Sequence, residues 1–154
     1  MKKIITILII AIVVVGGLIW ANKKGPISEG PIQIVALYPL TGGVASWGES
    51  SKGGTELAVE EINKSGGVNG RPLEVVYEDH KCDPKTALSI YQQKVINSKI
   101  FIGSSCSGTV LSIAPNLEKD GAIFIGTVVA SAKISSVSPS LFRNLAVETS
   151  QADL

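Results

Sequence analysis

The sequence has 154 residues, 45% of them hydrophobic and 18% charged, with 14 basic and 13 acidic side chains and a formal net charge of +1. Residues 1–24 contain four of the basic residues and none of the acidic ones, so the remaining 130 residues carry 10 basic and 13 acidic groups, a formal charge of −3. This balance disfavours a nucleic-acid-binding module, which needs a basic excess to neutralise phosphates. The length after residue 24 suffices for one domain with its own core.

The N-terminal segment, residues 1–24, has the features of an export signal. Ile4 to Trp20 is an uncharged run of seventeen residues with lysines on both sides, which indicates a signal peptide or an N-terminal membrane anchor. Both alternatives stay open, because the run is at the short end of what spans a bilayer and no clean cleavage site follows it. No Cys comes directly after the run, which excludes a lipoprotein anchor. Either alternative predicts an extracytoplasmic domain, joined through a linker at residues 25–31.

Strand and helix patterns alternate from residue 32 onward. Ile32 to Leu37 is an apolar run typical of a strand buried on both faces, and Ser51 to Ser65 has an apolar stripe at helical spacing. Asp83 is expected to cap the next helix and Pro84 to open it. The further expected strands are residues 73–77, 99–103 and 122–125.

A third helix is expected between the last two of these strands. Pro115 predicts a bend in it, and Gly121 ends it. Its inner face is expected to consist of Val110, Ile113, Ala114 and Leu117. After the short run 141–143, Ser150 and Asp153 have the spacing of a helix start, one turn before the last residue. A helix that starts without continuing predicts that the sequence is a fragment of a longer protein.

The order of elements predicts the fold class. Strands that alternate with helices over short connections favour an α/β protein with an open, doubly wound parallel sheet. In such sheets, ligands bind beyond the carboxyl ends of the strands. The loops expected at those ends are residues 38–48, 78–83, 104–108 and 126–131.

Two cysteines, Cys82 and Cys106, fall in these loops after the second and third strands. In an exported protein they can form a disulfide, which would stabilise the fold by roughly 3.5 kcal/mol in the chain-entropy model. The alternative is a pair of free buried thiols. His80 lies nearby and is expected to be a solvated loop residue, because one His and two Cys match no recognised metal-ligand spacing.

The segment 103–109 indicates an anion site. It has the glycine spacing of a phosphate loop without the lysine, which argues against nucleotide binding. Backbone N–H groups at the start of the third helix, with the hydroxyls of Ser105 and Ser107, can instead hold a carboxylate. The alternative is a serine that only caps the helix. No catalytic motif is visible, so the sequence predicts a protein that is not an enzyme and needs no cofactor or metal.

Four segments together resemble the leucine/isoleucine/valine-binding family of type I periplasmic solute-binding proteins. They are the string YPLTGGVASWG at residues 38–48, the helix GGTELAVEEIN at 53–63, the turn GGVNG at 66–70 and the strand that leads to Glu78 and Asp79. The segments at Cys82 and Cys106 are also similar to disulfide-bearing segments of the branched-chain amino-acid receptors. The likeness covers residues 32–154, and it implies the first lobe of a two-lobe fold whose second lobe is absent from this sequence.

The resemblance also implies a ligand site and partners. Ser107 matches a serine that receives the ligand carboxylate, and Trp47 an aromatic residue that covers the solute side chain. Ser131 and Val129 are the expected contacts from the next loop. The implied function is an extracytoplasmic, monomeric substrate-binding protein that takes a branched-chain or related amino acid to an ABC permease. The first rival is a ligand-binding sensor domain of a membrane-anchored receptor, and an enzyme of flavodoxin-like architecture is a distant second.

Overall fold

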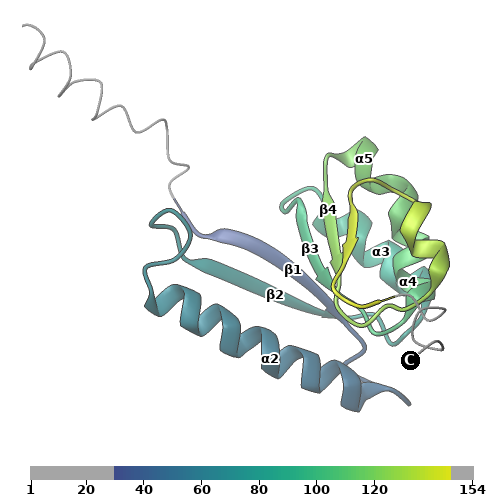
Figure 1. The fold of residues 1–154 in the computed structure, drawn as a ribbon, viewed down its shortest axis with the longest axis horizontal. Helices are drawn as coiled ribbons and strands as arrows, with labels where there is room; N and C mark the ends of the chain where they lie inside the picture. Colours follow the sequence, from purple (N-terminus) through teal and green to yellow (C-terminus); the bar gives the residue numbers. More distant parts are fainter. Residues whose placement is uncertain (1–29, 147–154) are drawn as a thin grey trace, which may run out of the picture. The chain divides into compact units, whose positions relative to one another are not determined.

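A computed structural model of the chain describes residues 30–146. The export segment, most of the linker and the helix signal at residues 150–153 lie outside this range. In the described part, no helix combines the length and the apolar character that crossing a membrane requires. Residues 31–146 form an α/β lobe around one sheet (Figure 1). The lobe therefore tests the predictions made for residues 32 onward.

The sheet has five parallel strands in the order β2-β1-β3-β4-β5. This confirms the predicted fold class. The strands are β1 (Ile32–Tyr38), β2 (Leu73–Asp79), β3 (Ile100–Gly103), β4 (Ile123–Gly126) and β5 (Leu141–Arg143). The helices are α2 (Ala45–Lys64), α3 (Pro84–Lys94), α4 (Ser107–Ile113), η1 (Ala114–Asn116), α5 (Leu117–Asp120) and η2 (Ala132–Ser136).

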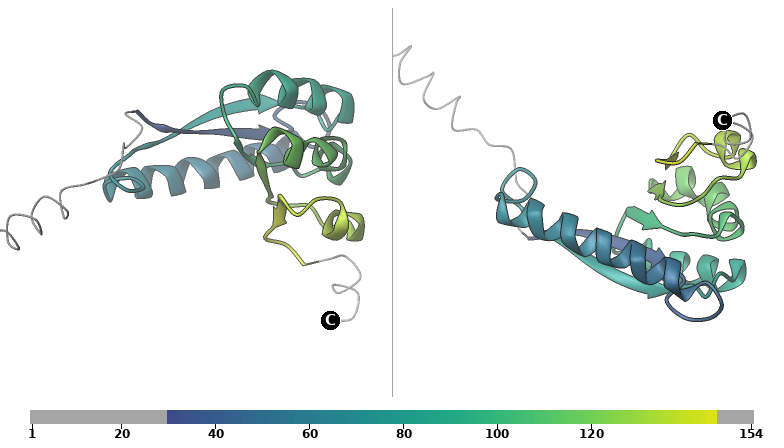
Figure 2. Two further views of the ribbon diagram at one scale, coloured as in Figure 1. Left: turned by 90° about the horizontal axis from the view of Figure 1, so that it is seen from above. Right: turned by 60° about the horizontal axis from the view of Figure 1, so that its bottom comes forward.

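The strand order decides which face each helix covers. The chain moves one way across the sheet from β1 to β2, and the other way from β2 past β1 to β3, β4 and β5. Right-handed crossovers in opposite directions place their helices on opposite faces. Figures 1 and 2 accordingly show α2 along β1 and β2, with α3 and α4 gathered at the other side of the sheet. Among the described residues, α2 is thus the only long helix on its face.

The core lies between the sheet and the helices α3 and α4. Phe101 and Phe124, from neighbouring strands, are 0% and 1% exposed, and the ring of Tyr91 packs 4.8 Å from that of Phe101. The buried hydroxyl of Tyr91 donates to Oδ2 of Asp120 at 2.9 Å. The residues expected to form the inner face of the third helix are all buried, as predicted: Val110, Ile113, Ala114 and Leu117.

Two helix features follow from local sequence. Asp83 caps α3 by accepting from the Thr86 N–H at 2.7 Å, with Pro84 at the first position, as predicted. The bend predicted at Pro115 is present as η1, a turn of 3₁₀ helix between α4 and α5. Pro115 lies in the first positions of this turn, where a missing N–H leaves no intrahelical hydrogen bond unmade.

The start of α2 differs from the expectation. The helix begins at Ala45, six residues before the predicted Ser51. Gly48, with its low helix propensity, interrupts the helical pattern of this first part. A Cβ on Gly48 would lie 2.1 Å from the carbonyl oxygen of Pro39, so this position needs a residue without a side chain. The glycine that obscures the helix in the sequence thus allows the β1 loop to pack against it.

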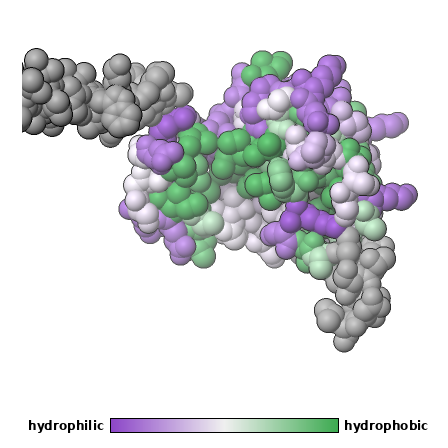
Figure 3. All heavy atoms as spheres, turned by 45° about the horizontal axis from the view of Figure 1, so that its top comes forward, coloured by the Kyte–Doolittle hydropathy of each residue, from purple (hydrophilic) through white to green (hydrophobic). Residues whose placement is uncertain are grey.

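The sheet face on the α2 side is incompletely covered. Ile123, Ile125 and Phe142, on β4 and β5, are 39%, 37% and 54% exposed. Beside them, α2 and the sheet enclose an open, mostly apolar groove of about 440 Å³ that reaches Val128 and Asn144. The space-filling view in Figure 3 shows hydrophobic surface as a broad band on the lobe. Parallel sheets are ordinarily covered on both faces, so this apolar surface needs a further cover.

Candidate ligand-binding site

The carboxyl ends of the strands lie at one edge of the lobe, as expected for a parallel sheet. Tyr38 pairs with Asp79 at the ends of β1 and β2, and Gly103 pairs with Gly126 at the ends of β3 and β4. The direction of the chain across the sheet reverses between β1 and β3, and ligands of open α/β sheets bind at such a reversal. The loops after β1, β3 and β4 therefore form the candidate site.

The loop after β3 is held by a buried hydroxyl. Ser104 is 1% exposed, and its Oγ accepts from the Cys106 N–H at 3.0 Å and lies 2.6 Å from the hydroxyl of Thr109. Gly103 and Ser104 both have left-handed backbone angles, with φ of 117° and 66°. A Cβ on Gly103 would lie 2.4 Å from the carbonyl oxygen of Leu37, so the loop passes directly against β1. These contacts determine where α4 begins.

Ser107 is the first residue of α4 and is partly exposed. Within residues 30–146, its hydroxyl makes no hydrogen bond, and α4 has no side-chain cap. Ser105, two residues earlier, has a buried Oγ without a partner in the same range. The N–H groups of a first helical turn have no intrahelical acceptor. Apart from the Cys106 N–H, which donates to Ser104, unused donors therefore gather at residues 105–108, where the sequence predicts an anion site.

The loop after β4 lies beside the loop after β3. The N–H groups of Thr127 and Val128 donate to the carbonyls of Gly103 and Ser104 at 3.1 and 3.3 Å. The structure thus brings together the two segments that contain the predicted contacts Ser107, Val129 and Ser131.

Val129 and Ser131 differ in what they offer a ligand. The side chain of Val129 is 0% exposed and lies against Gly126, so only its backbone is available. Ser131 is half-buried just before η2, and its carbonyl accepts from Nη1 of Arg143 at 3.1 Å. That contact anchors the loop to β5 and leaves the Ser131 hydroxyl uncommitted among the described contacts.

Trp47 lies on the first turn of α2, not in a loop, and its side chain is 57% exposed. No hydrogen bond or ring contact between described residues joins it to Ser107, Val129 or Ser131. Trp47 lies near the candidate site only because it follows the loop after β1. That loop and the loop after β3 flank the point where the strand order reverses.

Asp79, at the end of β2, positions the β1 loop, a role that the sequence analysis missed. Its carboxylate accepts from the Leu40 N–H at 2.9 Å, from the Thr41 hydroxyl at 2.5 Å and from the Lys81 N–H at 2.9 Å. Burial acts to raise the pKa of Asp79, but these hydrogen bonds, led by that of Thr41, hold it below its ordinary value. The position of Asp79 could have indicated this role, because it ends a strand beside the loop that follows the neighbouring strand.

The sulfur atoms of Cys82 and Cys106 lie 1.97 Å apart, and their Cα atoms 5.7 Å apart. These are bonding distances for a disulfide. The pair joins the loop after β2 to the residue that precedes α4, next to Ser107. Of the two alternatives open in the sequence, the described geometry fits the disulfide.

The prediction that His80 is solvated is wrong. Its side chain is 0% exposed and lies under the loop that contains Cys82. Polar residues in a connection suggested solvent exposure, whereas the turn folds back so that the Cys82 N–H donates to Nδ1 of the imidazole. No group of side chains in residues 30–146 has the arrangement of a metal site.

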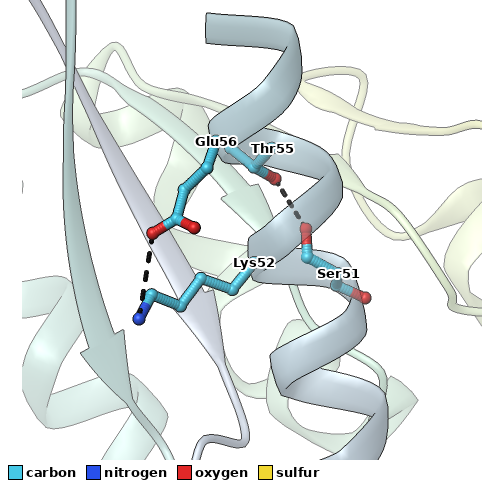
Figure 4. Close-up of polar contacts among 4 residues, drawn as sticks. All are labelled: Ser51, Lys52, Thr55 and Glu56. Carbon is cyan, nitrogen blue, oxygen red and sulfur yellow. Dashed lines mark hydrogen bonds and ion pairs between the residues drawn. The ribbon is translucent and has the colours of Figure 1, made fainter. Parts of the chain in front are cut away.

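Polar side chains of α2 make contacts within the helix, drawn in Figure 4, and contacts with the sheet. The hydroxyl of Thr55 donates to the carbonyl of Ser51 at 2.9 Å and lies 2.8 Å from the hydroxyl of Tyr38 on β1. Lys52 and Glu56 form an ion pair at 3.8 Å, and the Lys52 ammonium lies 5.5 Å from the ring centre of Tyr77. These groups satisfy one another, so they belong to the framework and not to the ligand site.

The sequence of this chain matches a known protein family and several known proteins. The family described as "Periplasmic binding protein" matches residues 31–153. The leucine-, isoleucine-, valine-, threonine- and alanine-binding protein of Pseudomonas aeruginosa is 36% identical over 123 residues, covering 78% of this chain and 33% of that protein. The Leu/Ile/Val-binding protein of Escherichia coli is 31% identical over 107 residues, covering 68% of this chain and 29% of that protein.

Solved structures agree with this result. The branched-chain amino acid transporter substrate binding protein LivJ from Streptococcus pneumoniae, in complex with isoleucine, superposes with a TM-score of 0.71 at 28% identity, covering 76% of this chain and 34% of that one. The chain spans about a third of the length of the relatives that it matches. The match over nearly all of the lobe, in sequence and in fold, shows that the chain belongs to the periplasmic binding protein family.

Proposed function

We propose that this chain is the first lobe of a two-lobe substrate-binding protein of an ABC importer, and that it takes a branched-chain or related amino acid. The observation that carries the proposal is the pairing of the 103–107 and 126–131 loops at the strand-order reversal. Relatives named for binding leucine, isoleucine and valine support the choice of solute.

The lobe offers complementary groups for the backbone of an amino acid. Donors at the start of α4, including the Ser107 hydroxyl, suit the carboxylate. The carbonyl of Val129 and the hydroxyl of Ser131 suit the ammonium group as acceptors. Trp47, exposed at the start of α2, suits the aliphatic side chain. One lobe leaves the ligand half solvated, so tight binding requires the second lobe.

The uncovered sheet face supports the rest of the proposed architecture. The first crossover places α2 on that face and the later ones place their helices on the other, so connections between the described strands do not cover Ile125 and Phe142. We assign the cover to polypeptide beyond this lobe, in keeping with relatives about three times as long as the matched region. Residues 32–154 are then a first lobe, as the sequence predicts.

The proposed location is extracytoplasmic, with residues 1–24 as a signal or tether and 25–31 as a linker. An oxidising compartment allows Cys82 and Cys106 to remain bonded. The proposed partners are the solute and an ABC permease, with the protein acting as a monomer. Periplasmic relatives support the compartment.

Amide-resolved NMR can test the proposal on the chain itself. Titrating ¹⁵N-labelled chain with L-isoleucine should move the amide signals of Ser107, Gly108 and Val129 with an affinity in the millimolar range, about −4 kcal/mol. D-isoleucine is the matched control for the stereochemistry of the site. Shifts confined to other parts of the lobe, or equal shifts with both enantiomers, would count against this assignment.

A further inference from the structure

His80 is the only histidine in the sequence and is fully buried. Its backbone is held on both sides, because its N–H donates to the Tyr38 carbonyl at 3.1 Å and its carbonyl accepts from the Asp83 N–H at 2.8 Å. The imidazole is therefore placed between the end of β1 and the start of α3. Neither the ligand contacts nor the core described above explains why a titratable ring lies there.

The imidazole supports a turn with an uncommon backbone. Its Nδ1 accepts from the Cys82 N–H at 3.0 Å. Lys81 and Cys82 both have left-handed angles, with φ of 52° and 59°, which residues other than glycine adopt rarely. An N–H that points at Nδ1 requires this nitrogen to be unprotonated. This contact fits a neutral ring with its proton on Nε2. Nε2 is itself buried and has no hydrogen-bond partner among the described residues.

The same turn is connected to the candidate ligand site. Cys82 is at bonding distance from Cys106, and Cys106 immediately precedes Ser107, the first residue of α4. A shift of the Cys82 backbone would thus reach the start of α4 through a short covalent path. Ser104 and Thr109 hold the other side of Cys106, so the position of Ser107 depends on both anchors.

We propose that His80 is a positioning residue whose neutral ring holds the Cys82 turn and, through Cys106, the carboxylate site at Ser107, and that protonation of the ring weakens ligand binding. A proton on Nδ1 would face the Cys82 N–H donor to donor, so the hydrogen bond is lost. The proposal rests on the proposed function for its ligand. Its structural part, the coupling of the ring to the turn, does not depend on that function.

Burial favours the neutral ring. It is the largest influence on the pKa of His80 and lowers it below its ordinary value, against the opposing effects of the His80 backbone, the Asp79 carboxylate and the Leu37 backbone. Residues 103–113, on the far side of the disulfide, contain no group that titrates apart from the bonded Cys106. The other titratable or charged groups on the end of β1, the 80–83 turn and the start of α3 are Tyr38, Lys81, Asp83 and Lys85, and the end of β2 adds Tyr77 and Glu78.

Nitrogen NMR of the single histidine tests the structural part without any substitution. On the full chain in a mild detergent, ring ¹⁵N shifts at pH 8 should identify the tautomer protonated on Nε2, and the ring should titrate below pH 6.5. The amide signals of Cys82 and Ser107 should move with the same midpoint. A ring protonated on Nδ1 at pH 8, or amides that do not follow the ring, would overturn the inference.

His80→Asn separates titration from structure, because the Asn side-chain oxygen can accept from the Cys82 N–H without binding a proton. In the unsubstituted chain, isoleucine should bind about two- to tenfold more weakly when His80 is protonated, the effect of one lost hydrogen bond. In His80→Asn this pH dependence should be absent. If isoleucine moves no signals at any pH, the proposed function fails. If it binds with the same pH dependence in both proteins, only the role of His80 fails.

Discussion

Removing the bond between Cys82 and Cys106 should lower the free energy of unfolding by an amount that the chain length predicts. The two residues are 24 apart in sequence. For a closed loop of that length, the chain-entropy relation gives about 12 cal/mol/K, or about 3.5 kcal/mol at 25 °C. For a lobe of this size, that corresponds to a fall in Tm of roughly 10–15 °C.

Circular dichroism melts of the protein with and without dithiothreitol measure this difference. The double variant Cys82→Ser, Cys106→Ser is the matched control, because the reductant should not change its melting temperature. Alkylation and mass spectrometry of the non-reduced protein establish separately whether the thiols are bonded. A confirmed bond whose reduction changes the unfolding free energy by less than about 1 kcal/mol would refute the loop-closure reasoning. Two free thiols would refute the disulfide itself.

Three further predictions concern the site, its pH dependence and the uncovered face. In the two-lobe protein, Ser107→Ala should weaken amino-acid binding about tenfold to a hundredfold by calorimetry with little change in unliganded Tm, whereas a mere cap would show the reverse pattern. Because burial depresses the pKa of folded His80, its contribution to the free energy of unfolding should be complete above pH 6.5 and decline as pH falls toward the folded pKa. Urea titrations of His80→Asn should lack this decline. An equal decline in the variant would contradict the assignment. Ile125→Lys should reduce self-association and hydrophobic-dye binding of the isolated lobe. The control Ile96→Lys, which changes a 77% exposed residue away from β4, should leave both unchanged. Equal effects of the two substitutions would show that the sheet face is not responsible.

Much of the fold could be predicted from the sequence because its signals are local. Asp83 followed by Pro84 starts a helix by capping and by a fixed backbone angle, and Pro115 forces a tighter turn wherever the chain goes afterward. The order of apolar runs and helical stripes likewise determines a parallel sheet. The cap and the tighter turn depend on a few neighbouring residues, so they can be predicted before the long-range pairing of the strands is known.

The features that escaped prediction depend on contacts between distant segments. His80 is buried because the end of β1 and the turn at Cys82 enclose it, and nothing in residues 79–83 alone indicates that. The early start of α2 depends on Gly48 accepting the close approach of Pro39. The strand ends predict where a ligand site should lie, but the adjacency of Gly103 and Thr127 depends on the register of β3 and β4.

The contacts around the site have a common physical effect, which is to order its loops before a ligand arrives. The loop after β1 is held by Asp79, the loop after β2 by His80 and Cys82, and the loop after β3 by the buried hydroxyl of Ser104. Ordering a residue on binding costs about 1–2 kcal/mol of backbone entropy, so a loop ordered in advance leaves more of the interaction energy for affinity. The donors at Ser107 remain unused in this arrangement. Under the proposed function, the carboxylate of the solute supplies the acceptors that these donors lack.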